Sequence, residues 1–211
     1  MREDLVIIGA GDFAREAMWL AERMNEERPQ WNLLGFVDDA LVGQTVDSWP
    51  VLGDIGWLTK YESHVCAACA IGSGKVRQMI WERLKANQNV QAATLIDPTV
   101  VIGRGSSVAP GSILCAGTVL TVAVSVGRHC ILNLNCTVGH DTVLEDFVTV
   151  HPGSNISGKV RIGTRSLAGT GTKIIQGLAI APDITLGAGA VVNRELTEPG
   201  TYVGVPARRI H

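Results

Sequence analysis

Aliphatic side chains recur at every sixth position between residues 96 and 197, and this repeat is the dominant pattern of the chain. The series runs from Ile96 to Val192 without an insertion, and Ala168 is its one small member. The fifth residue of each hexad is also small or apolar. An α-helix repeats roughly every 3.6 residues and a simple strand about every two, so neither explains this period. The pattern predicts a β-solenoid in which each hexad is one short strand and a corner, with the aliphatic residues stacked inside.

Glycine often follows the inward residue directly, as at Gly103, Gly139 and Gly163, where a tight corner favours a residue without Cβ. The repeat resembles that of the hexapeptide acyltransferases, in which three hexads form one coil of a left-handed parallel β-helix. This resemblance implies that the seventeen hexads of residues 96–197 form between five and six coils. The alternative is a β-helix that only holds subunits together.

A different pattern precedes the repeat. The apolar run Leu5-Val6-Ile7-Ile8 predicts a buried parallel strand, and Gly9-Ala10-Gly11-Asp12-Phe13-Ala14-Arg15 then opens a helix to about Met24. Further strands are predicted at residues 33–37, which end at Asp38 and Asp39, and at 65–71, which end at Gly72 and Ser73; a helix follows at about 76–86. Strand, G-x-G-x-x-A and helix in this order form a Rossmann-like phosphate loop. Ligands of open parallel sheets bind beyond the carboxyl ends of the strands, so the three loops should form one crevice.

The size of this region limits the ligand. An NAD site needs an acidic residue about twenty positions after the glycines, and Asp38 comes later than that. Only about three strands are predicted before residue 96, too few for a complete dinucleotide domain. The crevice therefore suits a mononucleotide or a nucleotide-linked sugar. The alternative interpretation is a glycine turn that serves packing alone. We expect a Rossmann-like domain at residues 1–92 and a β-helix domain with a C-terminal tail at residues 93–211.

The two parts together resemble one subfamily of bacterial sugar acetyltransferases, which includes enzymes of sialic acid O-acetylation and of UDP-linked 4-amino sugar N-acetylation. The similarity covers nearly the whole chain and extends to Val203-Gly204-Val205-Pro206-Ala207-Arg208. It implies that the N-terminal domain binds a nucleotide sugar, that the β-helix binds acetyl-CoA, and that the protein is a homotrimer. One of the amino-sugar enzymes carries a histidine where this chain has Phe13, so contacts to the sugar or phosphate are expected to differ there.

Acetyl transfer to an amine or hydroxyl needs a base for the acceptor's proton, and histidine suits this role. His140 is third in its hexad and is therefore expected on the exterior of the β-helix. The resemblance implies that His140 is the general base, that Asp141 is its acidic partner, and that Asn133 orients the acceptor. A carboxylate next to the imidazole can select its tautomer and stabilise its charged form.

Matching by hexad position, the resemblance implies acetyl-CoA contacts at Gly158, Gly169, Thr170 and Ala188. Relatives usually have a histidine at the position of Thr149, where it contacts the acyl group, whereas this chain has His151 two residues later. Two residues of extended chain span up to about 7 Å, so His151 should not reach the same place with the same ring direction. We therefore expect Thr149 to donate a hydroxyl hydrogen bond to acetyl-CoA, with His151 as the alternative.

The cysteines offer a covalent route as a rival to direct transfer. Cys130 and Cys136 occupy the fifth hexad position, which points into the core, where a thiol is generally inert. Cys115 has no adjacent base in the sequence, so direct transfer is favoured. Cys66 and Cys69 have the spacing of a metal or redox pair, but they lie in an apolar run without a second ligand pair. No metal is expected.

Composition and charge indicate which partners and which cellular compartment to expect. The net charge is −2 and no basic stripe is present, so a nucleic-acid partner is not expected. No export signal and no apolar run of the roughly eighteen residues that span a membrane is found, and five cysteines, an odd number, fit reduced thiols. The prediction is a cytoplasmic N-acetyltransferase that acetylates a nucleotide-linked amino sugar for surface glycan biosynthesis. The alternatives are O-acetylation of a sialic acid-type sugar and a non-catalytic scaffold that binds nucleotide sugars.

Overall fold

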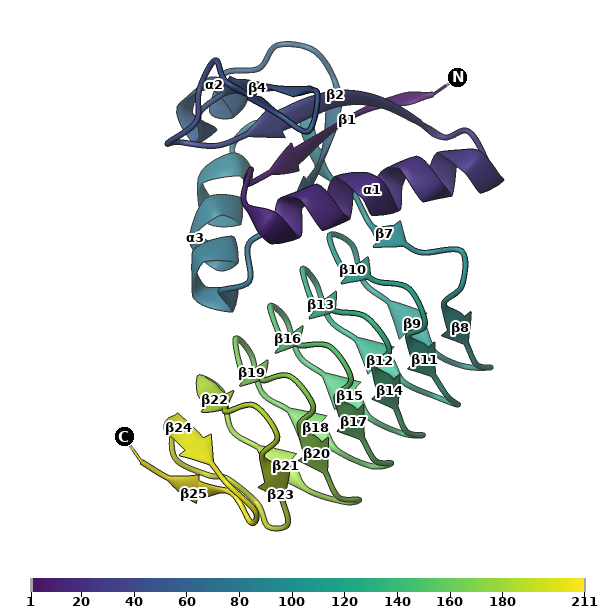
Figure 1. Cartoon of the computed structure of the whole chain (residues 1–211), viewed down its shortest axis with the longest axis vertical. Coiled ribbons are helices and arrows are strands. Elements are labelled where there is room, and N and C mark those ends of the chain that lie inside the picture. The colour runs from purple at the N-terminus through teal and green to yellow at the C-terminus, as the bar shows by residue number, and fades with distance from the viewer. Residues whose placement is uncertain (1, 211) are drawn as a thin grey trace.

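The computed structural model describes residues 2–210, which form an N-terminal α/β domain and a β-helix (Figure 1). The N-terminal domain has one six-stranded sheet in the order β3-β4-β2-β1-β5-β6, parallel except for the β3–β4 pair. Its strands are β1 (Glu3–Ile8), β2 (Trp31–Val37), β3 (Thr45–Val46), β4 (Trp49–Gly53), β5 (Val65–Cys69) and β6 (Val90–Ala92). Its helices are α1 (Asp12–Glu27), α2 (Ile55–Thr59) and α3 (Gly74–Leu84).

The two faces of this sheet are covered by different helices. Leu5 and Ile7 of β1 share one hydrophobic cluster with Ala14 and Ala17 of α1. Val6 and Ile8 of the same strand share the other cluster with apolar residues of α2 and α3. Because successive side chains of a strand point to opposite faces, an unbroken apolar run is what a strand between two helical layers requires. Three strands and α2 were not predicted, since β3, β4, β6 and α2 are too short to show a period.

The β-helix consists of three parallel sheets, which we call faces 1, 2 and 3. Face 1 holds β7 (Leu95–Ile96), β10 (Ile113–Leu114), β13 (Ile131–Leu132), β16 (Thr149–Val150), β19 (Leu167–Ala168), β22 (Ile184–Leu186), β24 (Gly200–Val203) and the antiparallel β25 (Arg208–Arg209). Face 2 holds β8 (Val101–Ile102), β11 (Val119–Leu120), β14 (Thr137–Val138), β17 (Asn155–Ile156), β20 (Lys173–Ile174) and β23 (Val191–Val192). Face 3 holds β9 (Ser107–Val108), β12 (Ser125–Val126), β15 (Val143–Leu144), β18 (Arg161–Ile162) and β21 (Ala179–Ile180).

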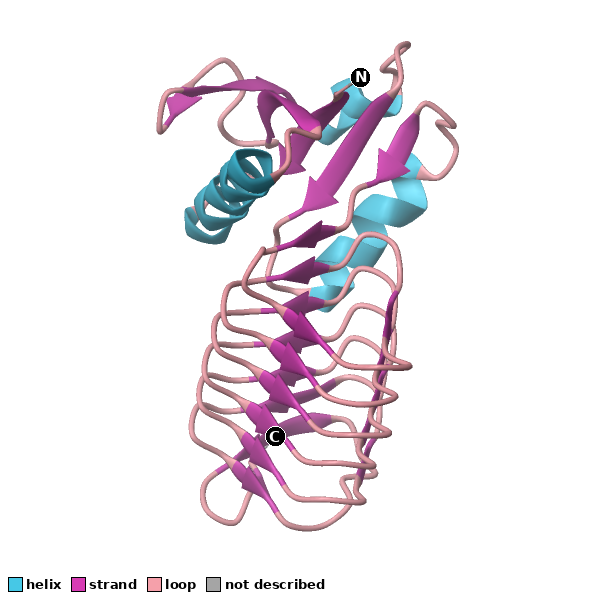
Figure 2. Ribbon diagram, turned by 90° about the vertical axis from the view of Figure 1, so that its right-hand side faces the viewer, coloured by secondary structure: helices cyan, strands magenta, loops and turns pink. Residues whose placement is uncertain are grey.

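Each strand pairs with the strand one coil further on, as Ile113 does with Ile131 and Leu114 with Leu132. This offset equals three hexads, so the expected fold class of an α/β domain followed by a parallel β-helix is confirmed (Figure 2). The aliphatic series forms the interior. Leu114, Leu120 and Leu132 are fully buried, and even Ala168 is 2% exposed. The first coil differs, because Ile102 is 41% exposed at the open end of the prism.

The corners depend on two backbone features that fall at different hexad positions. The fourth residue of the hexads from Ile102 to Leu186 has a positive φ, and non-glycine residues such as Asn135 (φ 56°) and Asp141 (φ 57°) adopt it as readily as Gly117 (φ 74°). The glycines at the second position do not have a positive φ. Instead, a Cβ on Gly139 would come within 2.4 Å of the backbone of the next coil. Close approach of successive coils, rather than the turn conformation, therefore explains these glycines.

We name the corners by the faces that they join. The 1–2 edge includes residues 133–136 and 151–154, the 2–3 edge includes 139–142 and 157–160, and the 3–1 edge includes 127–130 and 145–148. The N-terminal domain rests on the upper part of face 1. The outward residues Leu95, Ile113 and Ile131 belong to the same hydrophobic cluster as α1. An ion pair between Arg23 and the buried Asp97 (2.7 Å) adds a polar contact between α1 and the first coil.

Arg77 of α3 joins the N-terminal domain to the 3–1 edge. Its side chain is 1% exposed and has no acidic partner among its hydrogen bonds. The guanidinium instead donates to five backbone carbonyl oxygens, those of Ile71, Gly72, His129, Phe147 and Val148, at 2.7–3.2 Å. Burial lowers the pKa of Arg77 to about 10, so the group remains charged at neutral pH. Five N–H donors in one plane match this set of carbonyls, which a lysine could not satisfy.

A stack of three aromatic rings lies beside Arg77. His129 lies between Trp81 of α3, at a centroid distance of 4.5 Å, and Phe147, at 5.1 Å. Burial, and then the nearby Arg77 charge, lowers the pKa of His129 to about 4. The imidazole is therefore neutral at pH 7 and acts as a packing group. None of the helices described over residues 2–210 is both long and apolar enough to cross a bilayer.

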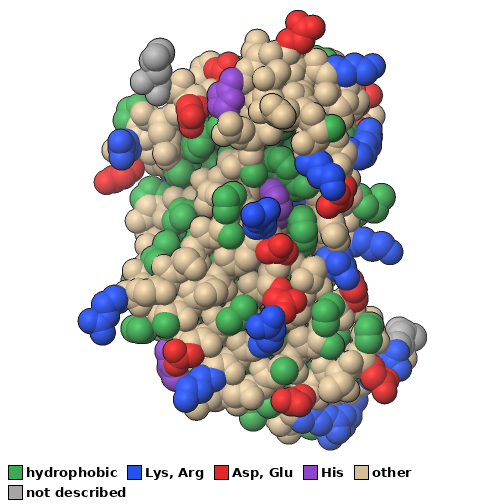
Figure 3. Space-filling model, turned by 180° about the vertical axis from the view of Figure 1, so that it is seen from behind, with side chains coloured by type: hydrophobic (Ala, Val, Ile, Leu, Met, Phe, Trp, Pro, Cys, Tyr) green, Lys and Arg blue, Asp and Glu red, His purple; other side chains and the backbone are tan. Residues whose placement is uncertain are grey.

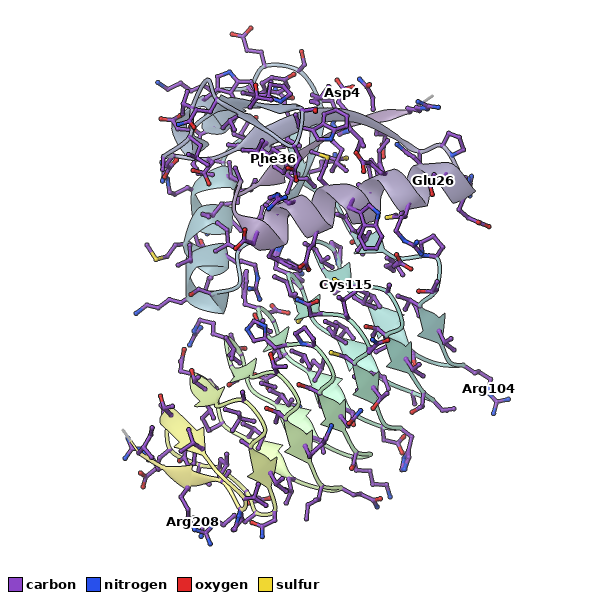
Figure 4. All side chains as sticks on the ribbon, viewed as in Figure 1. Asp4, Glu26, Phe36, Arg104, Cys115 and Arg208 are labelled. Carbon is purple, nitrogen blue, oxygen red and sulfur yellow. The ribbon has the colours of Figure 1, made fainter. Side chains whose placement is uncertain are left out.

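Replacing Arg77 with lysine should lower the free energy of unfolding by about 2–4 kcal/mol, because several buried carbonyls lose a charged donor. Urea denaturation measures this difference. The matched control is Arg104→Lys at the exposed 2–3 edge (Figure 4), where we expect a change below about 0.5 kcal/mol. Equal effects of the two substitutions would contradict the role given to Arg77.

Candidate active site

A crevice opens at the carboxyl ends of β1, β2 and β5, as the parallel strands predicted. It encloses about 230 Å³. Its lining residues are Ile8, Gly9, Val37, Asp38, Asp39, Ile55, Ile71, Val76, Met79, Ile80 and Arg83. The structure thus brings Gly9, Asp38 and Asp39 together, three of the predicted substrate-binding residues. A larger open hollow of about 730 Å³ lies between α3 and the 3–1 edge, but its Arg165 is already paired with Asp183 at 2.6 Å.

The two aspartates at the end of β2 hold the surrounding loops and leave one oxygen available. Asp38 accepts hydrogen bonds from the backbone N–H of Ala10 (3.0 Å) and of Ala40 (2.9 Å), one on each carboxylate oxygen. Asp39 accepts from the N–H of Ile55 (2.9 Å) through Oδ1. Asp38 therefore shapes the glycine loop, whereas Oδ2 of Asp39 can accept a hydrogen bond from a hydroxyl or ring N–H of a ligand.

The glycine loop leads into an uncapped helix terminus. Gly11 is the N-cap residue of α1 and has no side chain to cap the helix, and within residues 2–210 no side-chain hydrogen bond to this end of the helix is present. Free N–H groups and the positive end of the helix dipole favour an anion. A Cβ on Gly11 would meet nothing within 4 Å, whereas Gly9 has a φ of +97° that disfavours other residues. Gly9 is therefore needed for the turn, and Gly11 leaves space for a ligand.

Some predicted substrate residues of this loop do not face the crevice. Arg15 binds Asp47 through two hydrogen bonds of 2.5 and 3.2 Å and lies within 3.7 Å of Asp12. Ala14 is 1% exposed and packs beneath Gly9. Phe13 is partly buried against the α1 cluster, so its side chain contributes mainly to packing. The Arg15 side chain is thus paired with Asp47 of the β3–β4 turn, and its contact with substrate stays a prediction.

The apolar wall of the crevice was missed by the sequence analysis. Its apolar residues Val76, Met79 and Ile80 come from α3, which also contributes Arg83, and Ile55 comes from α2. The predicted helix at residues 76–86 contains most of them, but helical periodicity alone does not tell which side of a sheet a helix covers. Ser73, which was predicted to bind substrate, instead caps α3 by accepting a hydrogen bond from the Val76 N–H at 3.4 Å.

His140 and Asp141 form a pair on the 2–3 edge. The His140 Nδ1 lies 2.8 Å from Asp141 Oδ2, and both side chains are about half exposed, at 49% and 55%. A carboxylate only accepts hydrogen bonds, so Nδ1 carries the proton of this contact and Nε2 is left as an acceptor. The ring lies over Gly158 of the next coil, where an added Cβ would be 2.5 Å from Nε2. Gly158 was predicted to contact acetyl-CoA, and in the structure it also makes room for the imidazole.

Other predicted site residues of the β-helix lie on another edge. Asn133, predicted to orient the substrate, and the predicted cofactor residues His151, Gly169, Thr170 and Ala188 follow strands of face 1 and therefore belong to the 1–2 edge. Asn133 is 8% exposed, and burial, with Arg77 second, lowers the pKa of His151. The whole width of face 2 separates this edge from His140. One chain thus does not bring His140 and Asn133 together.

Thr149 is not placed to bind acetyl-CoA, contrary to our expectation. It is 1% exposed, and its hydroxyl donates a hydrogen bond of 2.8 Å to the carbonyl oxygen of Gly72. A hydroxyl has a single proton to donate, so none remains for a ligand. The reason is that the N-terminal domain covers face 1 at this coil. Thr149 and Arg77 both hold Gly72, so the loop after β5 is positioned by the β-helix.

The cysteines are unsuited to a covalent mechanism. Cys130 and Cys136 are fully buried, as predicted, and Cys115 is 4% exposed. Burial raises the pKa of Cys115 and of Cys130 to about 12 and that of Cys136 to about 11. A thiol that stays protonated is a poor nucleophile.

Comparisons with known proteins agree with this architecture. Residues 4–84 match the family model described as PglD N-terminal domain. The chain is 30% identical over 184 residues to GDP-perosamine N-acetyltransferase of Escherichia coli O157:H7. The aligned region covers 87% of this chain and 82% of that protein. The chain belongs to the hexapeptide-repeat sugar N-acetyltransferases. Members of this family are acyltransferases, and the non-catalytic alternative is therefore set aside.

Solved structures of the family superpose along the whole chain. The acetyltransferase domain of PglB from Neisseria gonorrhoeae, in complex with acetyl coenzyme A, has a TM-score of 0.91 at 28% identity and covers 100% of both chains. PerB from Caulobacter crescentus, in complex with CoA and GDP-perosamine, has a TM-score of 0.89 at 26% identity and covers 99% of this chain and 97% of that one.

Thr149→Val should raise the Michaelis constant for the nucleotide sugar several-fold, because the Gly72 loop loses one hydrogen bond worth about 0.5–1.5 kcal/mol. The Michaelis constant for acetyl-CoA should not change. Steady-state kinetics with each substrate varied in turn measures both. Thr185→Val is the matched control, since Thr185 has the same hexad position on face 1 but is exposed. An increase in the Michaelis constant for acetyl-CoA alone would show that Thr149 contacts acetyl-CoA after all.

Proposed function

We propose that this protein transfers the acetyl group of acetyl-CoA to the amine of a nucleotide-linked amino sugar, as a step in surface glycan biosynthesis. The observation that carries the proposal is the His140–Asp141 pair, exposed on the edge of a β-helix whose N-terminal domain has a nucleotide-sized crevice. N-acetylation is favoured over O-acetylation because a relative that matches 87% of this chain is a GDP-perosamine N-acetyltransferase. Assaying UDP-, GDP- and dTDP-linked 4-amino sugars against sugars with only hydroxyl acceptors tests this choice.

His140 is the general base of the proposed reaction. Nε2 accepts a proton from the acceptor amine as the nitrogen attacks the thioester carbonyl, and Asp141 stabilises the imidazolium that forms. Backbone N–H groups of the cleft stabilise the oxyanion, and the C–S bond then breaks. The leaving thiolate takes the proton, so that CoA departs as the thiol and the imidazole is neutral again. No enzyme-bound acyl group is needed, in keeping with the buried cysteines.

The nucleotide part of the substrate occupies the crevice of the N-terminal domain. The diphosphate lies at the uncapped start of α1, beside Gly11. The nucleobase lies against the apolar wall of α2 and α3, and Asp39 Oδ2 accepts a hydrogen bond from it or from the ribose. Met79 and Arg83 at the mouth of the crevice contribute to the choice of base. This arrangement directs the sugar away from α3, toward Asn133 and the 1–2 edge.

The protein acts as a homotrimer in which neighbouring chains complete each site. Within one chain the base lies on the 2–3 edge, whereas Asn133 and the expected cofactor residues lie on the 1–2 edge. If face 2 of each chain faces a threefold axis, the 2–3 edge of one chain meets the 1–2 edge of the next. Exposed apolar residues support contact there: Val101 on face 2 is 56% exposed, and Val122 and Ile175 on the 2–3 edge are 49% and 45% exposed.

His140→Ala should lower kcat by about 10²–10⁴ while leaving nucleotide-sugar affinity nearly unchanged, because the imidazole acts on a proton and not on the nucleotide. Rapid-quench turnover and calorimetric binding measure the two quantities. Arg104→Ala, at the same hexad position two coils earlier, is the control and should retain full activity. A His140→Ala variant that keeps more than about a third of the wild-type rate would rule out the base assignment.

Complementation between two inactive variants tests the shared site. His140→Ala removes the base, and Gly11→Val blocks the phosphate position in a chain whose fold tolerates a side chain there. Random mixed trimers made by co-expression should recover about a quarter of wild-type activity, because half the chains carry an intact base and half an intact N-terminal domain. Purification through two different tags confirms mixing. Fully mixed trimers without activity would show that each site lies within one chain.

A further inference from the structure

Three side chains with metal-binding chemistry meet at the amino ends of β1 and β5, outside the site described above. They are Glu3, His64 and Cys66, and one ligand atom of each lies within 4.8 Å of the other two. The Cys66 Sγ is 3.9 Å from the Glu3 Oε2. None of these residues has a part in the proposed acetyl transfer.

The cluster differs from the Cys66–Cys69 pair suggested by the sequence spacing. Residues three apart on a strand point to opposite faces of the sheet. Cys66 accordingly packs on the α1 side, and Cys69 packs on the side of α2 and α3. The two thiols therefore cannot hold the same ion.

Strand register explains why the other two ligands join Cys66. β1 and β5 are parallel, with Leu5 opposite Cys66. Glu3 begins β1, two residues before Leu5, and His64 lies just before β5, two residues before Cys66. Residues two apart in an extended chain share a face. His64 and Cys66 are therefore close along one segment of the chain, and Glu3 approaches them from β1. Glu3 and His64 are exposed while Cys66 is buried, so an ion would have access from solvent.

We propose that this cluster binds one zinc ion through the Glu3 carboxylate, the His64 imidazole and the Cys66 thiolate, with water as the fourth ligand. Mixed oxygen, nitrogen and sulfur ligands are typical of zinc, and bonds of about 2.0–2.3 Å place tetrahedral ligand atoms roughly 3.3–3.8 Å apart. The three ligand atoms lie within 4.8 Å of one another, so binding requires them to approach by up to about 1 Å. The thiol proton is released to solvent when the sulfur–zinc bond forms.

The local electrostatics favour a cation. The carboxylates of Glu3 and Asp4 are close enough to act on the Cys66 sulfur. Their negative potential attracts a divalent ion. Asp4 lies at the outer side of the N-terminal domain, away from the β-helix (Figure 4). The ion would link the beginnings of two central strands, at the opposite end from the crevice, and so stabilise the fold without entering the reaction.

Cobalt substitution tests the ligand set directly. Protein without an affinity tag is titrated with Co²⁺, whose thiolate complexes have a near-ultraviolet charge-transfer band, and Zn²⁺ is then added as a competitor. We expect one equivalent of Co²⁺ per chain, a thiolate band, and loss of the band with Zn²⁺. Zn²⁺ should also raise the melting temperature.

Matched variants make the outcome decisive. Cys66→Ser should abolish the band, and Cys69→Ser, three residues along the same strand, should retain it. Because Cys66 is buried, the double variant Glu3→Gln/His64→Gln provides a second test at exposed positions, with zinc affinity lowered at least about tenfold. A band that survives Cys66→Ser, or equal zinc affinity of the wild type and the double variant, would overturn the proposal. Neither result bears on the acetyltransferase activity, which is assayed separately.

Discussion

A buried guanidinium holds the two halves of this molecule in place. Arg77 lies on α3 of the N-terminal domain, and its guanidinium reaches the carbonyl oxygens of His129, Phe147 and Val148 in the β-helix. Burying this charge without an acidic partner is unfavourable unless carbonyl dipoles satisfy its donors, so its position tolerates little displacement. The same side chain donates to Ile71 and Gly72, at the end of β5. The geometry of the crevice therefore depends on the β-helix as much as on the sheet that forms its floor.

The repeat of the β-helix also decides where chemistry can be placed. Each corner has a fourth residue in the left-handed region, which glycine, asparagine and aspartate accept with little strain. Asp141 uses such a position beside His140, and Gly158, one coil further on, leaves room for the ring. A corner can thus carry an exposed His–Asp pair while the strands on either side keep their regular stacking. Positively and negatively charged side chains are otherwise interspersed on the surface, as Figure 3 shows for one face.

The geometry of three edges has a further consequence for the proposed reaction. A prism that stacks equivalent residues vertically keeps residues of different edges apart, whatever its length. His140 is therefore separated from Asn133 by the width of face 2 although only six residues lie between them in sequence. In the homotrimer proposed above, association through that face brings the proposed base of one chain to the N-terminal domain of its neighbour.

Local and periodic features could be predicted from the sequence. The period of six is imposed by burial at every coil, so the β-helix and its core residues, including the inert Cys130 and Cys136, could be predicted from the chain alone. The glycine loop and the two aspartates after β2 could likewise be assigned to one crevice, since parallel strands end at a common edge. Contacts between the two halves could not be predicted. Thr149 faces Gly72, Arg15 faces Asp47, and α3 supplies a wall of the crevice, all through packing between segments far apart in sequence. The period of the hydrophobic residues indicates which side chains are buried. Only the tertiary structure decides which segment covers them and which polar atoms remain free for a ligand.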